Sequence, residues 1–463
     1  MVDLNEFVKS IGDRPVYVVG LGKSGMASVR ALVKAGANVL AWDDDQDAHA
    51  AAKRAKAKVE SPEMVDFAQL SYVVLAPGIP LTHPTPHPVV TKAQTYDVPV
   101  IGDLELLHLS NHGIKTIGIT GTNGKSTTTA LIGHVLQKCG VKAAVGGNIG
   151  NAVLSMKLPE STEAIVLEMS SFQIDLCPSF RPDIGVLLNV TPDHIDRHGS
   201  LDRYAEIKAS IFDADNIAII SVDDELCQNI IHRLEHDQHK IIRLSTEEKV
   251  DFGVFAEERM LVDATIEEGN DNVGSFNLLP ALSGVHNHQN AIAAYAVARQ
   301  FDLGPEQIFE AMKSFPGLPH RQQIVRTING VAYINDSKAT NADSTSKALA
   351  TYRNLYWIVG GRAKDGGLDG LEEYMERIRY AYLIGEAAEE FSSWLEKRGV
   401  TYHFSKTMER AVVDAHEQAQ ADKGQPGGTG CVLLSPACAS FDQYQNFEER
   451  GDRFISLVEE LKE

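Results

Sequence analysis

The chain has 463 residues, of which 43% are hydrophobic, and a formal net charge of −20. This length predicts about three domains of ordinary size, and the apolar content suffices for their cores. The acidic balance argues against nucleic acid or an anionic membrane as a partner, so an anionic small substrate would need locally placed lysine and arginine side chains.

Cysteine usage and the first residues of the chain point to a reducing compartment. The cysteines are scattered and form no close pair, which argues against a zinc site. Residues 1–9 contain acids and no long apolar core, unlike a signal peptide, and no run approaches the roughly 18 apolar residues of a membrane span. We therefore expect a cytoplasmic protein without membrane insertion. The cysteines are Cys139, Cys177, Cys227, Cys431 and Cys438.

The first part of the chain has the order strand, glycine-rich loop, helix, strand and acid, which is typical of a dinucleotide-binding unit. The first acid follows the last loop glycine by 18 residues, about where a ribose-binding acid lies. The loop alone is a weak signal, because any nucleotide diphosphate can use it, nicotinamide and flavin cofactors included, and the acids could form a solvated turn. The segments are a strand over 15–20, Gly20-Leu-Gly22-Lys-Ser-Gly25, a helix over 26–35, and a strand over 38–42 followed by Asp43, Asp44 and Asp45.

Two further strands, over 72–76 and 98–102, complete a first domain that ends near residue 103. Between them the chain contains Pro77-Gly-Ile-Pro80 and prolines at 84, 86 and 88. Proline fixes its own backbone angle and restricts the residue before it, so we expect extended or turn geometry in the segment that follows residue 80.

A second glycine-rich loop, Thr120-Gly-Thr-Asn-Gly-Lys-Ser-Thr127, lies between an apolar strand over 114–119 and a helix that runs to residue 139. Glycines let backbone N–H groups point at phosphate oxygens, and the helix offers its positive N-terminus. Lys125 is placed to reach the outer phosphates and Ser126 to bind Mg2+. Ile119 stands where the common spacing has glycine. The alternative is an ordinary turn with Lys125 in solvent.

Two later strands end in candidate Mg2+ ligands. A strand over 163–167 leads into Glu168, which is placed to hold Mg2+ directly or through water, unless it is simply an exposed residue at a strand end. A strand over 184–189 precedes His194, a candidate ligand or orienter, because open α/β sheets bind ligands at the carboxyl ends of their strands. His198 has no such placement and receives no role.

Lys208 lies among apolar residues on a predicted helix over 201–212. This pattern alone favours a side chain that extends to water. The chain between 217 and 266 looks irregular, and a polar stretch over 267–275 follows. A helix over 291–299 begins after Asn287 and Asn290, whose amides can cap it or bind a ligand.

The proline- and glycine-rich segment 315–321 predicts a linker into a third domain. There, strands over 331–335, 355–359 and 432–434 are each followed by polar residues, which predicts a ligand crevice at their carboxyl ends. Lys338 and Lys364 could bind carboxylates or phosphates as point charges.

Together these motifs resemble those of the Mur ligase family, ATP-dependent amide-forming enzymes of peptidoglycan precursor synthesis. They follow the family's order over nearly the whole chain, and the family's own loop, Gly-Thr-Asn-Gly-Lys-Ser/Thr, accounts for the displaced first glycine. Two positions depart from the common pattern: Gln323 stands where glutamate is frequent, and Ala76 where serine is. The matching motifs are Thr120–Ser126, Gly147–Gly150, Glu168–Gln173, Asn189–His194, His286–Asn290, His320–Arg321, Asn335–Asn341 and Ser435–Ser440.

The resemblance implies an α/β fold with three domains. These are a Rossmann-like UDP-binding domain over 1–103, a central P-loop ATPase-like domain over 104–317, and a C-terminal Rossmann-like domain over 318–463 that binds an amino acid. It further implies a ligase that uses ATP and a pair of Mg2+ ions to add D-glutamate to UDP-N-acetylmuramoyl-L-alanine through an acyl phosphate. We also expect a monomer without nucleic-acid partners.

Three other functions remain open at this point. The nearest is a ligase of the same superfamily with a different amino acid or acceptor. The second is a non-catalytic nucleotide-binding protein. The third is an NAD-dependent oxidoreductase built on the first glycine loop, which the second, phosphate-binding loop argues against.

The resemblance also assigns roles residue by residue. Lys208 matches a lysine that becomes carbamylated, which converts a cation into a carboxylate-like metal ligand. The catalytic residues are Lys125, His194 and Lys208, and the metal ligands Ser126, Glu168, His194 and carbamylated Lys208. The ATP-binding residues are Gly121, Thr122, Asn123, Gly124, Lys125, Ser126, Thr127, Asn287, Arg321 and Asp336. The UDP-substrate residues are Lys23, Ser24, Asp43, Asp44, Asn148 and His194, and the D-glutamate residues Thr340, Lys364, Ser440, Phe441 and Phe447.

Overall fold

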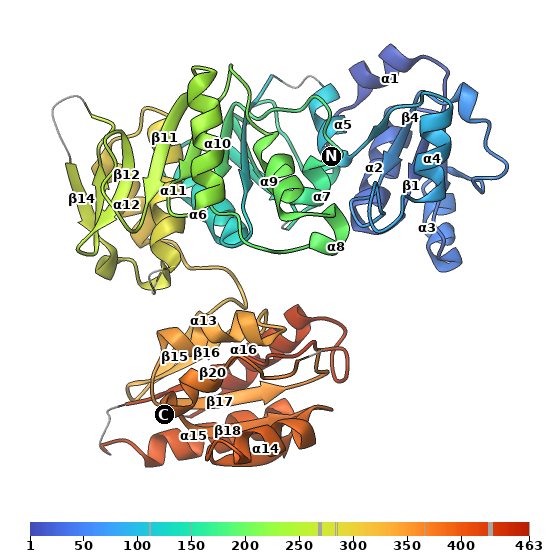
Figure 1. Ribbon diagram of the computed structural model, residues 1–463. Coiled ribbons are helices and arrows are strands. Elements are labelled where there is room, and N and C mark those ends of the chain that lie inside the picture. Colours follow the sequence, from blue (N-terminus) through green and yellow to red (C-terminus); the bar gives the residue numbers. More distant parts are fainter. Residues whose placement is uncertain are drawn as a thin grey trace. The chain divides into compact units, whose positions relative to one another are not determined.

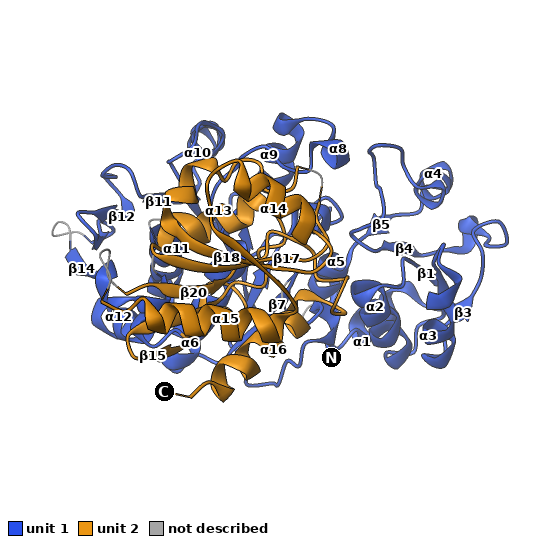
Figure 2. Cartoon of the chain, turned by 90° about the horizontal axis from the view of Figure 1, so that it is seen from below, with its two compact units in different colours: residues 1–315 blue, residues 316–463 orange. Residues whose placement is uncertain are grey.

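The chain folds into two compact units, Met1–Phe315 and Pro316–Glu463 (Figure 2). The computed structural model describes residues 1–110, 113–148, 150–266, 271–282, 284, 286–364, 366–424 and 429–462. Ile149, Ser283, Val285, Asp365 and residues 267–270 of the predicted polar stretch lie outside the described residues. Within the described ranges, no helix combines the length and the apolar character that a membrane crossing requires.

The first unit begins with a five-stranded parallel sheet in the order β3-β2-β1-β4-β5 (Figure 1). Its central strands are buried and apolar, as expected of a parallel sheet covered on both faces. Side chains of α1, α2 and α3 pack on one face and those of α4 on the other. The elements are α1 Asn5–Ile11, β1 Val16–Val19, α2 Lys23–Lys34, β2 Val39–Trp42, α3 His49–Arg54, β3 Lys58–Val59, β4 Tyr72–Leu75, α4 Pro88–Thr95 and β5 Val100–Ile101.

Helix α4 corrects the expectation of extended or turn geometry after the prolines. Pro88 occupies the first turn of this helix, where the missing N–H is not needed and the fixed backbone angle suits the helix. The side chain of His87 accepts a hydrogen bond from the N–H of Val89 and caps the helix. The expected geometry therefore holds only up to residue 87, which precedes the helix.

A nine-stranded sheet follows, in the order β14-β13-β12-β11-β10-β9-β6-β8-β7 (Figure 1). Strands β6 to β12 run parallel, and β13 and β14 are antiparallel additions. Helices α6, α11 and α12 cover one face and α7, α9 and α10 the other. The elements are α5 Asp103–Leu109, β6 Lys115–Thr120, α6 Lys125–Lys138, β7 Ala143–Gly147, β8 Ala164–Glu168, α7 Ser171–Ile174, β9 Ile184–Leu187, α8 Ile195–His198, α9 Leu201–Ala209, β10 Ile217–Ser221, α10 Glu225–His236, β11 Lys240–Ser245, β12 Gly253–Glu257, β13 Met260–Asp263, β14 Asp271–Ser275, α11 His286–Arg299 and α12 Pro305–Lys313.

The segment 217–266, which looked irregular in sequence, is regular. It contains β10, helix α10 and strands β11 to β13, and residues 271–275 of the stretch beyond it form β14. Asp224 caps α10 by accepting a hydrogen bond from the N–H of Cys227 at 2.8 Å. Cys227, Ile230, Ile231 and Leu234 are buried at the spacing of one helix face, so the sequence did carry the helical signal.

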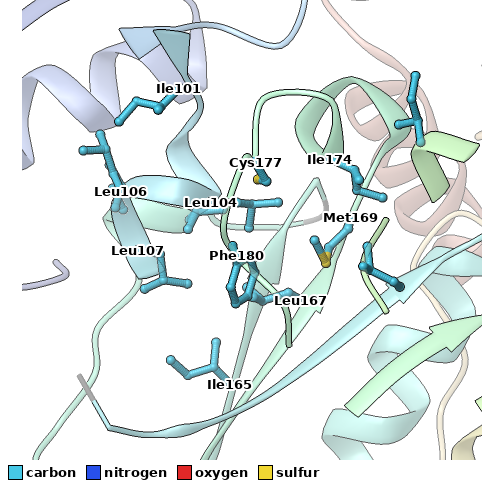
Figure 3. Packing of buried hydrophobic residues seen from close by; sticks show 14 of the residues in the cluster. Ile101, Leu104, Leu106, Leu107, Ile165, Leu167, Met169, Ile174, Cys177 and Phe180 are labelled. Atoms are coloured by element: carbon cyan, nitrogen blue, oxygen red, sulfur yellow. The ribbon is translucent and has the colours of Figure 1, made fainter. Parts of the chain in front are cut away.

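One hydrophobic core joins the two sheets of the first unit (Figure 3). Leu104 and Leu107 of α5 belong to a buried cluster that also contains Ile101 of β5 and Ile165 and Leu167 of β8. Burial of apolar surface is the dominant favourable term in folding, so this shared core fixes the two sheets together. The first unit is therefore a single packed body that contains two sheets.

The second unit is a six-stranded sheet in the order β15-β16-β20-β17-β18-β19, parallel except for β15. Helices α13 and α14 pack on one face, and α15 and α16 on the other. The three strands predicted to end in a ligand crevice are the neighbours β16, β20 and β17. The elements are β15 Gln323–Ile328, β16 Val331–Asn335, α13 Ala342–Thr351, β17 Leu355–Gly360, β18 Ile378–Ile384, α14 Ala388–Glu396, β19 Tyr402–Lys406, α15 Met408–Ala421, β20 Cys431–Leu434 and α16 Phe447–Glu460.

Candidate active site

The phosphate loop connects β6 to α6 at the carboxyl edge of the central sheet. Gly121 and Gly124 have φ angles of 153° and 84°, which glycine adopts far more readily than other residues. A Cβ atom on Gly124 would lie 2.4 Å from the Oδ1 of Asn290, so the loop also needs glycine for space. The Lys125 ammonium donates to the carbonyls of Gly121 and Thr122, both at 2.8 Å, and so lies over the loop.

Asn189 holds this loop, a role that the sequence did not reveal. Its Oδ1 accepts from the N–H groups of Thr122 and Asn123 at 3.1 and 2.8 Å. Its Nδ2 donates to Gln289 of α11 at 2.8 Å. Asn189 lies two residues after the end of β9, the strand beside β6, so the segment after one strand holds the loop that follows the other. Its position at a strand end within a matching motif was the signal available in sequence.

Helix α11 begins at His286, earlier than predicted, so Asn287 and Asn290 lie inside it rather than ahead of it. Asn290 accepts a hydrogen bond from Thr128 of α6 at 3.0 Å and donates one to Asn287 at 2.8 Å. Asn290 thus lies against the phosphate loop and the helix that follows it, and Asn287 contacts Asn290. Asn290 links two helices and is not a cap of its own helix.

Glu168 ends β8, which pairs with β6 so that Glu168 is in register with Ile119 just ahead of the loop. Its Oε1 accepts from the Nδ2 of Asn148 at 2.8 Å. Its Oε2 is buried and has no hydrogen-bond partner among the described residues. A buried anionic oxygen without a partner fits a hard cation such as Mg2+.

His194 follows β9 on the other side of β6 and adopts a left-handed backbone with φ of 53°. Such a conformation is unfavourable for a residue with a Cβ atom and concentrates at functional sites. The ring lies 4.9 Å from that of Phe172, and its Nε2 is 3.4 Å from a carboxylate oxygen of Asp193. The side chain is half exposed, so it is accessible to a ligand.

Lys208 contradicts the interpretation that its side chain extends to water. The residue is 1% exposed, and its ammonium donates to the carbonyl of Gly121 at 2.8 Å. The nitrogen also lies 4.4 Å from the centre of the Tyr204 ring. Burial, and then the charge of Lys125, hold the pKa of Lys208 well below its usual value. The apolar pattern around Lys208 therefore marked an inward side chain that ends under the phosphate loop.

His198 is a packed, buried histidine. Its Nε2 lies 3.0 Å from the hydroxyl of Ser171, and its ring contacts those of Phe172 and Tyr204. Burial, with a smaller effect of Arg197, lowers the pKa of His198 to about 4. The neutral ring therefore packs behind the site.

No group of three or more histidine, cysteine, aspartate or glutamate side chains converges within the ranges that the structure describes. A metal ion beside the phosphate loop would therefore need other ligands. The predicted metal ligands include such groups: the hydroxyl of Ser126, on the first turn of α6, and a modified lysine.

The first glycine loop follows β1 and is held by the acid that ends β2. Asp43 accepts a hydrogen bond from the N–H of Leu21 at 2.5 Å. Lys23 donates to the carbonyl of Gly150 at 2.5 Å, which links this loop to a turn of the central sheet. Asp44 is exposed and accepts from Trp42, which is the main cause of its lowered pKa. The residues predicted to bind the UDP substrate come from the five-stranded and the nine-stranded sheets, and all of them lie in the first unit.

Asp103 is a second residue that sequence did not single out. It is buried, its carboxylate accepts from Ser24 at 2.7 Å and from Gln173 at 3.3 Å, and burial raises its pKa. It connects the first glycine loop to α7, which begins three residues after Glu168. Its partners are 79 and 70 residues away in sequence, so no local pattern marks this contact.

The remaining predicted residues lie in the second unit. Asp336 follows β16, accepts from the Ser435 hydroxyl at 2.7 Å, and has its pKa raised to about 7 by burial. Ser440 is buried after β20, whereas Lys364 and Phe441 are exposed. Thr340 and Phe447 are partly buried. The predicted ATP residues are divided between the units, with Arg321 and Asp336 in the second.

Comparisons with known proteins cover nearly the whole chain. The family model described as MurD-like N-terminal domain of Mur ligases matches residues 14–102, the Mur ligase middle domain residues 119–298, and the Mur ligase glutamate ligase domain residues 320–438. Solved structures share the fold: UDP-N-acetylmuramate-alanine ligase from Thermotoga maritima, at a TM-score of 0.59 and 17% identity, covers 97% of this chain and 100% of its own. UDP-N-acetylmuramoyl-L-alanyl-D-glutamate–2,6-diaminopimelate ligase, at 0.57 and 20% identity, covers 92% and 93%.

Curated relatives are closer in sequence. UDP-N-acetylmuramoylalanine–D-glutamate ligase from Paramagnetospirillum magneticum is 43% identical over 447 residues, 96% of each chain. Proteins of the same name from Rhizobium etli and Brucella abortus are 45% and 44% identical over 98% and 97% of this chain and 96% and 97% of their own. Because such relatives and the family models span almost its full length, the chain belongs to the Mur ligase family.

Proposed function

We propose that the chain is an ATP-dependent ligase that adds D-glutamate to UDP-N-acetylmuramoyl-L-alanine in peptidoglycan precursor synthesis. The observation that carries this proposal is the identity of 43–45% to relatives of that name over 96–98% of the chain. The phosphate loop, with Glu168, His194 and Lys208 around it, supports the ATP-dependent part of the reaction.

The reaction has two steps that balance without another reactant. The L-alanine carboxylate attacks the γ-phosphorus of ATP, the bond to the β-phosphate oxygen breaks, and ADP leaves behind an acyl phosphate. The amine of D-glutamate then attacks the acyl carbon, loses a proton, and displaces phosphate to leave an amide. A carboxylate must approach a triphosphate, so placement of positive charge dominates catalysis. Lys125 supplies part of that charge at the outer phosphates.

Mg2+ supplies the rest of the positive charge when bound, and we propose a pair of ions. Ser126, Glu168, His194 and carbamylated Lys208 would hold them. The unpartnered Oε2 of Glu168 supports a cation at this position. Oxygen donors from serine, glutamate and a carbamate suit a hard cation, and His194 adds a nitrogen at the edge of the site.

The surroundings of Lys208 support its carbamylation. The amine attacks CO2, a C–N bond forms and a proton leaves, which turns a neutral amine into an anion. Only an uncharged lysine has the lone pair for this step, and burial lowers the pKa of Lys208 well below its usual value. A buried ammonium beneath Lys125 is unfavourable, whereas a carbamate there would pair with Lys125 and with Mg2+.

Substrate roles follow the same assignment. In the first unit, Lys23, Ser24, Asp43, Asp44 and Asn148 would bind the UDP substrate. The acid that would bind a ribose in a nicotinamide enzyme instead holds the loop, through Leu21. In the second unit, Thr340, Lys364, Ser440, Phe441 and Phe447 would contact D-glutamate. Asn287, Arg321 and Asp336 would complete the ATP site. The free cysteines support a reducing compartment such as the cytoplasm.

The test is ADP release from ATP and UDP-N-acetylmuramoyl-L-alanine with D-glutamate, L-alanine, L-lysine or diaminopimelate in parallel. We expect release that depends on D-glutamate and on the UDP substrate. Preference for another amino acid would assign a different ligase specificity, and release that needs no amino acid would exclude amide formation.

The phosphate loop is tested by replacing its lysine. We expect Lys125→Ala to abolish turnover, because its side chain acts on phosphate, while the thermal midpoint of unfolding stays within a few degrees of wild type. Near-normal turnover of this variant would overturn the loop assignment.

A further inference from the structure

The second unit contains a fully buried arginine, Arg450, on helix α16. It is 1% exposed and lies one turn after Phe447, the first residue of the helix. Its three described hydrogen bonds all go to neutral oxygens: the Ser337 hydroxyl at 3.0 Å, the Ser337 carbonyl at 2.8 Å and the Cys438 carbonyl at 3.0 Å. Its Nη1 has no hydrogen-bond partner among the described residues. Burial of a charged group costs free energy unless the group is paired, and these neutral acceptors offset that cost for the guanidinium only in part.

The guanidinium joins the loops that follow three neighbouring strands. Ser337 follows β16 and Cys438 follows β20, and these two strands are paired. Gly361 follows β17, and a Cβ atom there would lie 3.2 Å from the Arg450 Nη1. The loops after β17 and β20 also pair with each other, because the N–H of Arg362 donates to the carbonyl of Ala439 at 2.9 Å.

The Arg450 guanidinium is also linked, through Ser337, to the first residue of helix α16. The Ser337 hydroxyl, which accepts from the Nε of Arg450, donates to the carbonyl of Phe447 at 2.8 Å. Arg450 therefore ties the first turn of α16 to the loop after β16. These loops and this helix start carry all the residues assigned to the amino acid: Thr340, Lys364, Ser440, Phe441 and Phe447.

Charge adds a second effect to this mechanical one. Burial lowers the pKa of Arg450 only to about 10, so the group stays protonated at neutral pH. The hydrogen bonds to neutral groups and the nearby carboxylate of Asp442 compensate this buried charge in part. The remaining positive potential acts on the adjoining loops. An anionic ligand bound between these loops would gain from that potential, whereas a cationic one would be disfavoured.

We propose that Arg450 is a positioning residue for the amino-acid substrate, which it serves by fixing the three strand-end loops and by favouring a dicarboxylate ligand between them. This inference rests on the proposed function for the identity of the amino acid. It assigns Arg450 no contact with substrate. Its effect on D-glutamate runs through the loops, and the steps that involve only ATP and the UDP substrate should not depend on it.

The kinetic test compares Arg450→Lys, Arg450→Met and wild type in ADP release, with D-glutamate, ATP and UDP-N-acetylmuramoyl-L-alanine varied in turn. The lysine variant keeps the positive charge but loses the planar guanidinium with its several N–H donors, and the methionine variant loses both the charge and the donors. We expect the KM for D-glutamate to rise by at least about tenfold in both, more in the methionine variant, with the other KM values within about twofold. Arg453→Met is the matched control, because Arg453 lies on the same helix, is exposed and pairs with Glu409. It should behave as wild type.

Hydrogen–deuterium exchange of the full chain gives a readout that needs no substrate. In Arg450→Lys we expect faster exchange in residues 336–341, 360–364 and 435–441 together, and unchanged exchange in β18 and α14. An unchanged KM for D-glutamate, equal increases in all KM values, or unchanged exchange in the three loops would each overturn the inference. Wild type that is inactive with D-glutamate would instead overturn the proposed function. The kinetic comparison would then use whichever amino acid wild type accepts, and the exchange test would be unaffected.

Discussion

Lys208 shows how far a buried environment can change the chemistry of one side chain. Its nitrogen lies under the phosphate loop, hydrogen-bonded to Gly121 and close to the ring of Tyr204. The lysine most readily carbamylated is one that has lost its proton, and here burial and Lys125 both favour the neutral form. The residue that sequence alone would leave in solvent therefore becomes the strongest candidate for a modified metal ligand.

Replacing this lysine tests the assignment. We expect Lys208→Ala to lower kcat by at least about a hundredfold, because a group that stabilises transition-state charge is lost. Added acetate should restore part of the activity by placing a carboxylate in the space that the side chain leaves. Lys138→Ala, an exposed lysine at the end of α6, is the control and should have normal kcat. Normal activity of Lys208→Ala, insensitive to acetate and bicarbonate, would reject the carbamate.

Asp336 is a buried carboxyl whose titration should be visible in stability. Burial raises its pKa in the folded protein to about 7, above the ordinary value of 3.8, so the protonated form is favoured in the fold. The stability that this preference contributes is present below about pH 4 and is lost as pH rises through 7. The shift corresponds to at most about 4 kcal/mol. Wild type should therefore lose more free energy of unfolding between pH 5 and pH 8 than Asp336→Asn, which cannot titrate.

Urea unfolding followed by tryptophan fluorescence measures this difference in the full chain. Trp357 and Trp394 are two of the three tryptophans and lie in the second unit. Trp357 is buried in β17 and donates a hydrogen bond to the Ser435 carbonyl, and the Ser435 hydroxyl donates one to Asp336. Equal pH dependence in the two proteins would show that Asp336 is ionised throughout this range.

At the scale of elements, strands were the most predictable part of the molecule. Runs of valine, isoleucine and leucine mark β1, β4, β8 and β17 because both faces of a parallel sheet are buried. Helices were harder where other signals competed: α4 begins at a proline, and α10 lies in a polar segment whose apolar face has only four buried residues. The positions of the glycine loops and strand-end acids, and hence most of the candidate site, also follow from sequence.

The depth and partners of side chains did not follow from sequence. Lys208 looks like an ordinary helix cation in sequence, and no motif marks Arg450; the packing of distant segments shows that both are buried. Asp103 and Asn189 depend on contacts with residues about seventy positions away, which no periodicity encodes. The sequence therefore predicts where the candidate site lies, whereas the groups that hold its loops in place are visible only in the fold.

Gly25 allows helix α2 to approach the loop at Gly20 closely. It lies in the first turn of α2, where a Cβ atom would be 1.7 Å from the carbonyl oxygen of Gly20. We expect Gly25→Ala to push α2 away from β1, to lower the free energy of unfolding by about 1–3 kcal/mol, and to raise the KM for the UDP substrate. Thermal or urea unfolding and steady-state kinetics measure both effects. Gly22→Ala is the matched control for stability, because no atom lies within 4 Å of its Cβ position; equal stability losses would contradict the steric argument.

At the scale of the whole molecule, the proposed reaction draws on both units. The phosphate loop belongs to the first unit, and the residues assigned to the amino acid belong to the second. The amine must reach an acyl phosphate formed at the loop, so we propose that one unit moves against the other during turnover. The boundary between the units lies at Phe315 and Pro316, and we expect a hinge near Pro316 to Pro319.

Small-angle X-ray scattering can detect this closure. We expect the radius of gyration to fall when a non-hydrolysable ATP analogue and UDP-N-acetylmuramoyl-L-alanine are added together, because ligands that bridge the units favour a closed arrangement. UDP alone is the control, since its assigned residues all lie in the first unit. Identical scattering profiles with and without the two ligands would count against a hinge.

The hydrophobic core shared by α5, β5 and β8 (Figure 3) sets where this chain can be recombined with its relatives. A chimera joined near residue 102 would combine Ile101 from one parent with Leu104 and Ile165 from another, so one core would have to tolerate two sets of side chains. A junction at Phe315 and Pro316 divides none of the five buried clusters that the described residues form. With the amino acid bound by the second unit, as proposed, one splice would exchange amino-acid specificity between family members, whereas exchange of the proposed nucleotide-sugar site would have to carry the central sheet with it.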